Sequence, residues 1–309
     1  MKKIFSLILS LAMLLTITSG LNLTAYGCES LTSVTIPNSI TSIGREAFYD
    51  CTNLTSVTIP DSVTGIGDGA FYNCKSLTNV TIPNSITMIG PDTFCRCSSL
   101  ENITIPDSVT SICNHAFYEC TSITSISIPH SVTSIDDYAF YGTSLINLSI
   151  PASVASIGEG AFNGCKSLAN VTIGNNDSAE KRSTEIGNSA FSECTSLSSV
   201  TIGNNVTSIG AAAFFECELV TLTMGNGVNY IDSCAFLNCE QLYEVNYNGT
   251  VAQWKAISVD SNNSNLTKAI IKCTDGILGN GNEVIIDNVV YNIYDDYTAQ
   301  INIPEILKY

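Results

Sequence analysis

The residues with the greatest capacity for chemistry are thirteen cysteines and two histidines in a chain of 309 residues. Thiolates and imidazoles can hold zinc, or act as nucleophile and base. Cys95 and Cys97 form a Cys-x-Cys pair, but a zinc site of this kind needs a second pair at matching spacing, and no such pair follows. His115 and His130 fall near predicted turns, without a nucleophile motif or a carboxylate partner. We therefore predict no metal site.

Catalytic and cofactor motifs are also missing from the sequence. It contains no P-loop, dinucleotide fingerprint, nucleophile elbow or zinc-protease helix. The paired carboxylates Asp136-Asp137 and Asp295-Asp296 fall in predicted turns, where aspartate is favoured for backbone reasons. We predict a non-enzymatic protein with no catalytic residue and no cofactor.

The composition restricts the class of partner. The formal net charge is -16, and only 13% of the residues are charged. Nucleic acids and anionic membranes bind basic patches, so neither is an expected partner. Because hydrophobic residues make up 45% of the chain, a large core is possible, and Ser, Thr and Asn must supply most of the polar surface.

The N-terminus has the pattern of a secretory signal peptide, predicted over residues 1–25. Lys2 and Lys3 precede an apolar run over residues 4–17, and small residues allow cleavage after Gly20 or Ala25. A buried hydrophobic helix is the alternative interpretation. No other long apolar segment occurs, so no membrane span is expected in the mature chain.

A repeated strand motif is the strongest signal in the sequence. The segment LTSVTIP begins at Leu31, and related segments follow at intervals of 22 or 23 residues, with one interval of 29. Such self-similarity predicts a solenoid. The ten segments start at Leu31, Leu54, Leu77, Leu100, Ile123, Leu145, Leu168, Leu197, Leu219 and Leu242.

The first repeat shows how each unit should fold. Val34 and Ile36 alternate with Ser33 and Thr35, which is the period of a strand with one buried face. Pro37 should end the strand, because proline has no amide hydrogen for a ladder bond. Gly44 permits a bend, and residues 46–49 should form a short helical turn on the back. In later repeats glycine replaces the proline, at Gly174, Gly203 and Gly225, which indicates another turn type and not a domain boundary.

Apolar residues recur at fixed positions of the repeat and should stack as columns. One repeat cannot bury its own apolar face, so neighbouring repeats must share one core. Strands about 4.8 Å apart would form a parallel sheet roughly 45 Å long. The phenylalanine column is Phe48, Phe71, Phe94, Phe117, Phe140, Phe162, Phe191, Phe214 and Phe236, and an isoleucine column runs from Ile43 to Ile231.

Most of the cysteines form another column. They precede the first leucine of the repeat by three residues, or by two at Cys217, and Gly142 takes the place in the one repeat without a cysteine. A position filled so regularly is typical of a small buried residue, so we predict free buried thiols. Disulfides between neighbours are the alternative. The column is Cys28, Cys51, Cys74, Cys97, Cys120, Cys165, Cys194, Cys217 and Cys239.

The unit LTSVTIPNSITSIGREAFYDCTN closely resembles the BspA-like leucine-rich repeats of bacterial surface proteins. The Ile-Pro strand end, the Ser-Ile-Gly bend, the Ala-Phe pair and the cysteine before the next leucine all agree, over residues 28–248. Residues 247–276 are similar to the region that often follows such repeats. The resemblance implies a curved solenoid, export, and a role in adhesion or host-protein binding.

The predicted fold is a leucine-rich repeat solenoid: a curved parallel β-sheet with short helical turns on the convex side, in about ten repeats of 23 residues. The solenoid should occupy residues 28–248 and a C-terminal cap residues 249–276. In the cap, a short helix over residues 251–257 would turn Trp254 and Ile257 toward the last repeat. Residues 277–309 should form a β-hairpin tail, with a turn at Asp295-Asp296, or a truncated further module.

The outward side of the sheet is the candidate binding face. Its uncharged hydroxyl and amide groups suit extended contact with an extracellular protein or a glycan, with little electrostatic steering. Alternatively, Ser and Thr are simply good solvent-facing strand residues. The face consists of Ser33, Thr35, Ser56, Thr58, Asn79, Thr81, Asn102, Thr104, Ser125, Ser127, Asn147, Ser149, Asn170, Thr172, Ser199 and Thr201.

Two further features concern the surface. The interval of 29 residues carries an insertion whose charged residues Asp177, Glu180, Lys181 and Arg182 form a candidate binding loop, although neutral drift would also explain it. Tyr49, Tyr72, Tyr118 and Tyr141 form a partial aromatic column, for which partial core packing is the preferred explanation.

Together these patterns predict a non-catalytic binding module, secreted or at the cell surface, that serves adhesion or recognition of host or neighbouring-cell proteins through the sheet face. The alternative function is a self-assembling structural surface component. Its support is the poor N-terminal cap, because few residues precede Leu31 after cleavage and an unpaired edge strand would remain.

Overall fold

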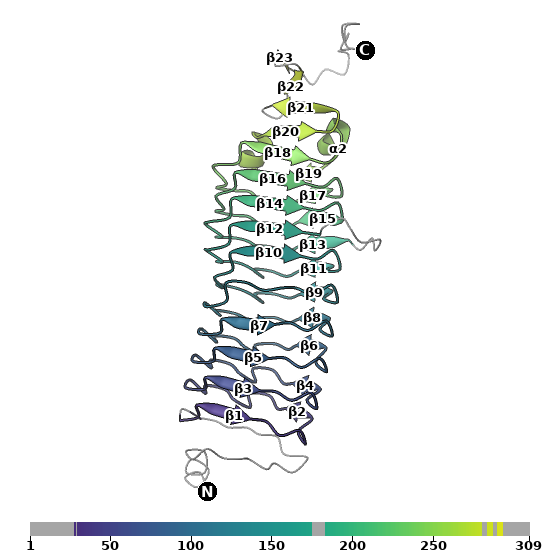
Figure 1. The fold of residues 1–309 in the computed structure, drawn as a ribbon. Helices are drawn as coiled ribbons and strands as arrows, with labels where there is room; N and C mark the ends of the chain where they lie inside the picture. The colour runs from purple at the N-terminus through teal and green to yellow at the C-terminus, as the bar shows by residue number, and fades with distance from the viewer. Residues whose placement is uncertain (1–27, 29, 175–182, 280–282, 287–288, 293–309) are drawn as a thin grey trace.

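The computed structural model describes residue 28 and residues 30–174, 183–279, 283–286 and 289–292. Over these ranges the chain winds into a parallel β-solenoid of about ten turns, about 23 residues apart (Figure 1). The predicted solenoid is therefore confirmed. The predicted signal peptide and the loop with Asp177, Glu180, Lys181 and Arg182 lie outside the described residues.

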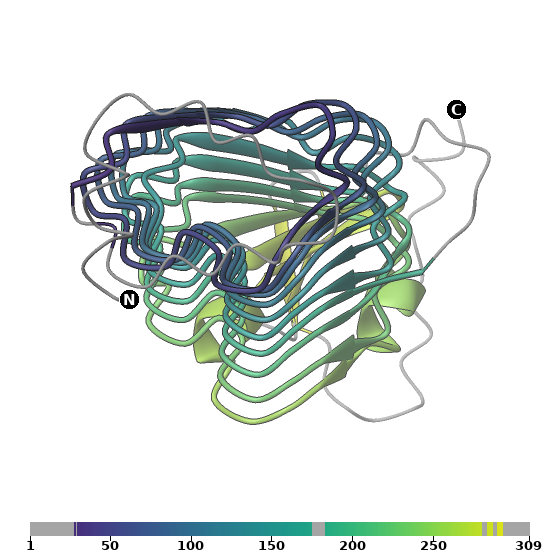
Figure 2. The same cartoon turned by 90° about the horizontal axis from the view of Figure 1, so that it is seen from below.

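Each turn of the solenoid from β1 to β19 contributes one strand to each of two layers, except that the turn with residues 124–128 contributes none to the first (Figure 2). The first layer consists of β1 (Ser33–Thr35), β3 (Ser56–Thr58), β5 (Asn79–Thr81), β7 (Asn102–Thr104), β10 (Asn147–Ile150), β12 (Asn170–Ile173), β14 (Ser199–Ile202), β16 (Thr221–Met224), β18 (Glu244–Tyr247) and β20 (Ile270–Cys273). The second consists of β2 (Ser42–Ile43), β4 (Gly65–Ile66), β6 (Met88–Ile89), β8 (Ser111–Ile112), β9 (Ser134–Ile135), β11 (Ser156–Ile157), β13 (Thr184–Ile186), β15 (Val206–Ile209), β17 (Tyr230–Ile231) and β19 (Ser258–Val259).

The phenylalanine column forms the centre of the shared core. Neighbouring rings from Phe48 to Phe236 stack with centroids 5.1 to 5.6 Å apart and planes within 15° of each other. All of these rings are buried. The stacking predicted from the repeat is therefore present along the whole array, and each turn depends on its neighbours for burial.

Residues 46–49 form turns where the sequence predicted short helical turns. The amide of Ala47 donates to the carbonyl of Gly44, as in a tight turn, but those of Glu46 and Phe48 donate to Asp68 and Ala70 in the next turn of the solenoid. The left-handed φ of 54° at Glu46 is incompatible with a continuing helix. The neighbouring turn supplies acceptors at every second residue, and this tertiary ladder replaces helical hydrogen bonds.

The change from proline to glycine at the strand ends alters the first layer. The amides of Gly174, Gly203 and Gly225 donate to Ile150, Ile173 and Ile202 in the preceding turn, a bond that proline cannot make. Strands β1, β3, β5 and β7 have three residues, whereas those from β10 onward have four. Between them, residues 124–128 are assigned to no strand, so the expected continuous ladder is wrong at this turn.

Gly203 yields a test of how closely the turns approach. A Cβ atom there would overlap the carbonyl group of Gly174, so Gly203→Ala should lower the free energy of unfolding by about 1–3 kcal/mol in urea titrations. Gly65→Ala is the matched control, because a Cβ at Gly65 would have no neighbour within 4 Å. Equal losses for the two variants would contradict the close approach.

The described C-terminal segment continues the first layer. Helix α2 (Val251–Lys255) begins with a capping box at Thr250, and the Trp254 ring meets the ring of Tyr247 edge-on at 5.2 Å. Helix α3 (Ser264–Thr267) precedes β20, after which β21 (Gly276–Gly279), β22 (Glu283–Ile286) and β23 (Val289–Asn292) add antiparallel strands. The predicted turn at Asp295-Asp296 lies outside the described residues.

Candidate binding surfaces

The first layer aligns the predicted binding residues in two columns, which we call the sheet face. Residues of β1, β3, β5 and β7 pair in register, so that Thr35, Thr58, Thr81 and Thr104 lie side by side. These side chains are exposed, as are those of the neighbouring Ser and Asn column. The strand alternation places Val57, Val80 and Ile103 on the opposite, buried side.

The sheet face continues after the interrupted turn. Asn147 pairs with Asn170, which pairs with Ser199, and Ser149, Thr172 and Thr201 form the second column. Amide side chains bond along the column, with the Nδ2 of Asn170 donating to the Oδ1 of Asn147 at 2.8 Å and that of Asn102 to Asn79 at 3.3 Å. Ser125 and Ser127 are exposed in the interrupted turn, outside any strand.

The sheet face also extends beyond the predicted set. In β16, Thr221 and Thr223 pair with Ser199 and Thr201, and Glu244 and Asn246 of β18 follow in the same columns. The sequence could have indicated these residues, because their spacing from Leu219 and Leu242 is the spacing of the predicted face residues from the first leucine of their repeats. Lys272 lies 2.7 Å from Glu244, so the C-terminal end of the face bears an ion pair.

An apolar stripe that was not predicted from the sequence lies beside the sheet face. Ile146, Val220 and Tyr243 each follow the first leucine of a repeat, and they are 48%, 52% and 65% exposed. The first five repeats carry Thr at this position, or Glu at Glu101, and Ala169 and Ser198 separate Ile146 from Val220. Adjacent exposed apolar side chains of the stripe, Val220 and Tyr243, are therefore found near the C-terminal end of the surface.

The cysteine column is buried and bonded to the backbone. Seven thiols each donate to the carbonyl of the phenylalanine in the preceding turn, at 3.0 to 3.3 Å; they are Cys74, Cys97, Cys120, Cys165, Cys194, Cys217 and Cys239. Burial raises the pKa of Cys97, Cys120, Cys194 and Cys217, and raises the pKa of Cys239 to about 12. Such thiols are poor nucleophiles at neutral pH.

Two predictions about this column are wrong. Cys28 and Cys51 form a disulfide, whereas free thiols were expected. These are the first two residues of the column, and the phenylalanine carbonyls that accept from the later thiols begin with Phe48. In the repeat without a cysteine, the column position is occupied by Thr143 and not by Gly142. The Thr143 side chain is buried, its hydroxyl donates to the carbonyl of Phe140, and it contacts the sulfur of Cys165 at 3.2 Å.

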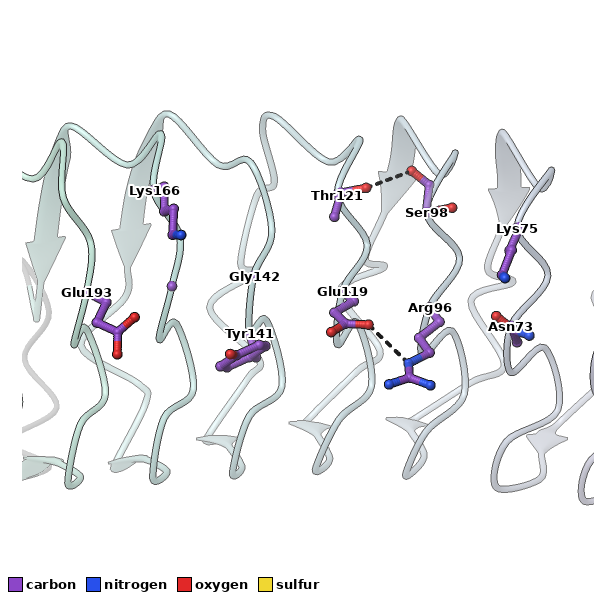
Figure 3. A pocket seen from close by; sticks show the side chains of 11 residues that line it. Asn73, Lys75, Arg96, Ser98, Glu119, Thr121, Tyr141, Gly142, Lys166 and Glu193 are labelled. Carbon is purple, nitrogen blue, oxygen red and sulfur yellow. Dashed lines mark hydrogen bonds and ion pairs between the residues drawn. The ribbon is translucent and has the colours of Figure 1, made fainter.

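A hollow of about 600 Å³ runs along one corner of the solenoid, and we call it the corner trench (Figure 3). Its charged lining comes from successive turns and comprises Lys75, Arg96, Glu119, Lys166 and Glu193. Arg96 and Glu119 form an ion pair of 3.0 Å. Tyr141 lies between Glu119 and Glu193, at a stretch where Gly142 contributes no side chain. No pattern in the sequence predicted this hollow.

Two other kinds of site are missing from the described residues. Within these residues, no helix combines the length and hydropathy of a membrane-crossing segment. In the same part of the chain, no three His, Cys, Asp or Glu side chains are grouped so that they could hold a metal ion.

Known proteins resemble the chain over most of its length. The model of the BspA type leucine rich repeat region matches in six copies, over residues 22–107, 87–183 and 177–281. A leucine rich cell surface protein from Faecalibacterium prausnitzii has 31% sequence identity, with 75% of this chain and 83% of that chain covered, at a TM-score of 0.47. A leucine-rich repeat protein from Bacteroides ovatus has 22% identity, with 81% and 85% covered, at a TM-score of 0.46. No curated protein matches the chain.

Proposed function

The chain belongs to the family with BspA type leucine rich repeat regions, and we propose that it is a non-catalytic binding module, secreted or held at the cell surface. The matching cell surface protein from Faecalibacterium prausnitzii supports the location, as does the predicted signal peptide. The module would serve adhesion or recognition of host or neighbouring-cell proteins.

The observation that carries this proposal is the register of the sheet face. Hydroxyl and amide groups repeat from strand to strand on an exposed surface, while the backbone groups between the strands are already paired. A partner would therefore meet side chains, with hydrogen bonds from Thr and Asn and contacts from the Thr methyl groups. Because the face carries little charge, shape and hydrogen bonding would determine specificity more than electrostatic steering.

The apolar stripe favours a protein partner over a glycan at this surface. Protein interfaces obtain much of their binding energy from a few apolar or aromatic anchors surrounded by polar contacts. Val220 and Tyr243 are exposed at the margin of the sheet face and are suited to this role. The proposed partner would cover the sheet face together with the stripe at its margin.

A pair of variants in one repeat tests the sheet face. Thr81→Arg places a long charged side chain on the face, whereas Thr87→Arg places the same side chain at an exposed position of the following segment, outside the face. We expect the first change to weaken binding to an immobilised panel of extracellular-matrix proteins at least tenfold, and the second to leave binding unchanged. Biolayer interferometry of folded samples would measure both.

Three outcomes would contradict the proposal: no saturable binding by the folded wild-type protein, equal effects of the two variants, or no effect of either. Self-assembly through the ends of the solenoid stays a prediction, because residues 1–27 and 293–309 lie outside the described ranges. The same holds for a binding role of Asp177, Glu180, Lys181 and Arg182.

A further inference from the structure

The corner trench is long and follows the solenoid axis. Its lining includes one residue at an equivalent position in each of six successive turns, from Asn73 to Glu193 (Figure 3). At about 4.8 Å per turn, it extends over roughly 24 Å. Its volume of about 600 Å³ is within the range of small-molecule sites. An elongated ligand lying along the axis fits this shape.

Two glycines keep the middle of the trench open. Gly142 and Gly164 have φ of 66° and 69°, but the same left-handed position holds Asn73, Arg96 and Glu119 in other turns, with φ between 53° and 61°. The backbone therefore does not require glycine there. Glycine instead changes the space: other turns carry a side chain at this position of the trench, and these two consecutive turns do not.

The trench gathers the basic residues of an acidic protein. Among the described residues from 30 to 248, the basic residues are Arg45, Lys75, Arg96 and Lys166, and three of these four line the trench. Arg96 is paired with Glu119, while Lys166 makes no ion pair within the described part of the chain. An anionic group on a ligand would be attracted to this corner, although the chain as a whole has a formal net charge of -16.

The chemistry of the lining favours a saccharide over a peptide. The amides of Arg96, Glu119 and Gly142 cannot donate to an extended peptide, because they already donate to the next turn of the solenoid. Apolar anchor pockets are missing from its described lining, where Tyr141 supplies the one aromatic ring. The lining instead surrounds the Tyr141 ring with carboxylate, hydroxyl and ammonium groups. These groups match a saccharide whose sugar rings carry hydroxyl and acidic groups.

We infer that the corner trench binds a linear acidic oligosaccharide. One sugar ring would lie over the open stretch at Tyr141, Gly142 and Gly164, with its carboxylate near Lys166. Glu119 and Glu193 would accept hydrogen bonds from sugar hydroxyls, and Lys75 and Arg96 would meet the next acidic group along the trench. The site is distinct from the sheet face, so the two can be tested separately.

The test uses a galacturonate hexasaccharide, its neutral methyl ester and a hexaglutamate peptide as probes in isothermal titration calorimetry. We expect the carboxylated saccharide to bind, and the ester and the peptide to bind at least tenfold more weakly. Lys166→Ala and Gly164→Asn should each raise the Kd about tenfold. Asparagine tolerates the left-handed position and occupies it at Asn73 and Asn238, so Gly164→Asn should fill the trench in a folded protein.

Lys255→Ala and Gly69→Asn are the matched controls, because Lys255 lies in α2 and Gly69 has a φ of 59° outside the trench lining. Both should leave the Kd unchanged. The inference is overturned by no binding of the carboxylated saccharide, by binding that neither trench variant weakens, or by equal binding of hexaglutamate, which would indicate a peptide site. If Gly164→Asn does not fold, the comparison of the Kd values of Lys166→Ala and Lys255→Ala decides the question.

Discussion

Truncation of Phe117 to alanine should lower the free energy of unfolding by about 3–5 kcal/mol, the range for a large aromatic side chain removed from a core. The ring is fully buried and stacks on Phe94 at 5.6 Å and on Phe140 at 5.1 Å. Backbone ladders hold the turns on both sides at fixed spacing, so the cavity cannot close by local collapse. Equilibrium unfolding in urea measures the loss.

Phe48→Ala is the matched control for this prediction. Phe48 stacks on one described neighbour, Phe71 at 5.2 Å, and it lies at the N-terminal end of the column. Its truncation should therefore cost clearly less than that of Phe117. A loss below about 1 kcal/mol for Phe117→Ala, or a larger loss for Phe48→Ala, would show that the turns do not share one continuous core.

Stability should also fall steeply above pH 9. Burial raises the pKa of five column thiols, with Cys239 raised to about 12, from an ordinary value of 9. The folded state keeps these protons, whereas the unfolded state releases them above pH 9. Each thiol therefore contributes stability that is fully present below pH 9 and is lost as the pH rises toward 12, at about 1.4 kcal/mol per pH unit.

Cys120→Ser separates the thiols from other groups that titrate at high pH. The serine hydroxyl does not ionise in this range, and it can donate to the carbonyl of Phe94 as the Cys120 thiol does. Urea unfolding between pH 8 and pH 11, without oxygen, should give a pH slope smaller by about one proton than that of the wild-type protein. Identical slopes, or wild-type stability that does not change over this range, would contradict the buried-thiol account.

The solenoid was predictable from the sequence because apolar residues recur at the same spacing within each repeat. The Phe column, the Ile column and the outward Ser, Thr and Asn columns all follow from one unit of about 23 residues, and the strand register then aligns them. The short helical turns were wrong because their hydrogen bonds depend on the neighbouring turn. The helix propensity of residues 46–49 contains no information about the neighbouring turn.

The candidate sites were predictable in part. The sheet face could be located from strand alternation, whereas the corner trench depends on which side chains are missing from a column. Gly142 was assigned to the cysteine column because it lies three residues before Leu145. Its φ of 66° matches that of Glu119, and the buried side chain after it belongs to Thr143. The residue lost from this repeat comes after Thr143, and the sequence alone did not locate that loss.

Hydroxyl-radical footprinting of the protein bound to a matrix protein tests the proposed binding face most directly. Val220 and Tyr243 are exposed beside the sheet face, and Met88 of β6 is 46% exposed in the second layer. Oxidation of all three side chains can therefore be measured. We predict that the partner protects Val220 and Tyr243 from oxidation and leaves Met88 as reactive as in the free protein. Protection of Met88, with Val220 and Tyr243 still reactive, would contradict binding through the sheet face.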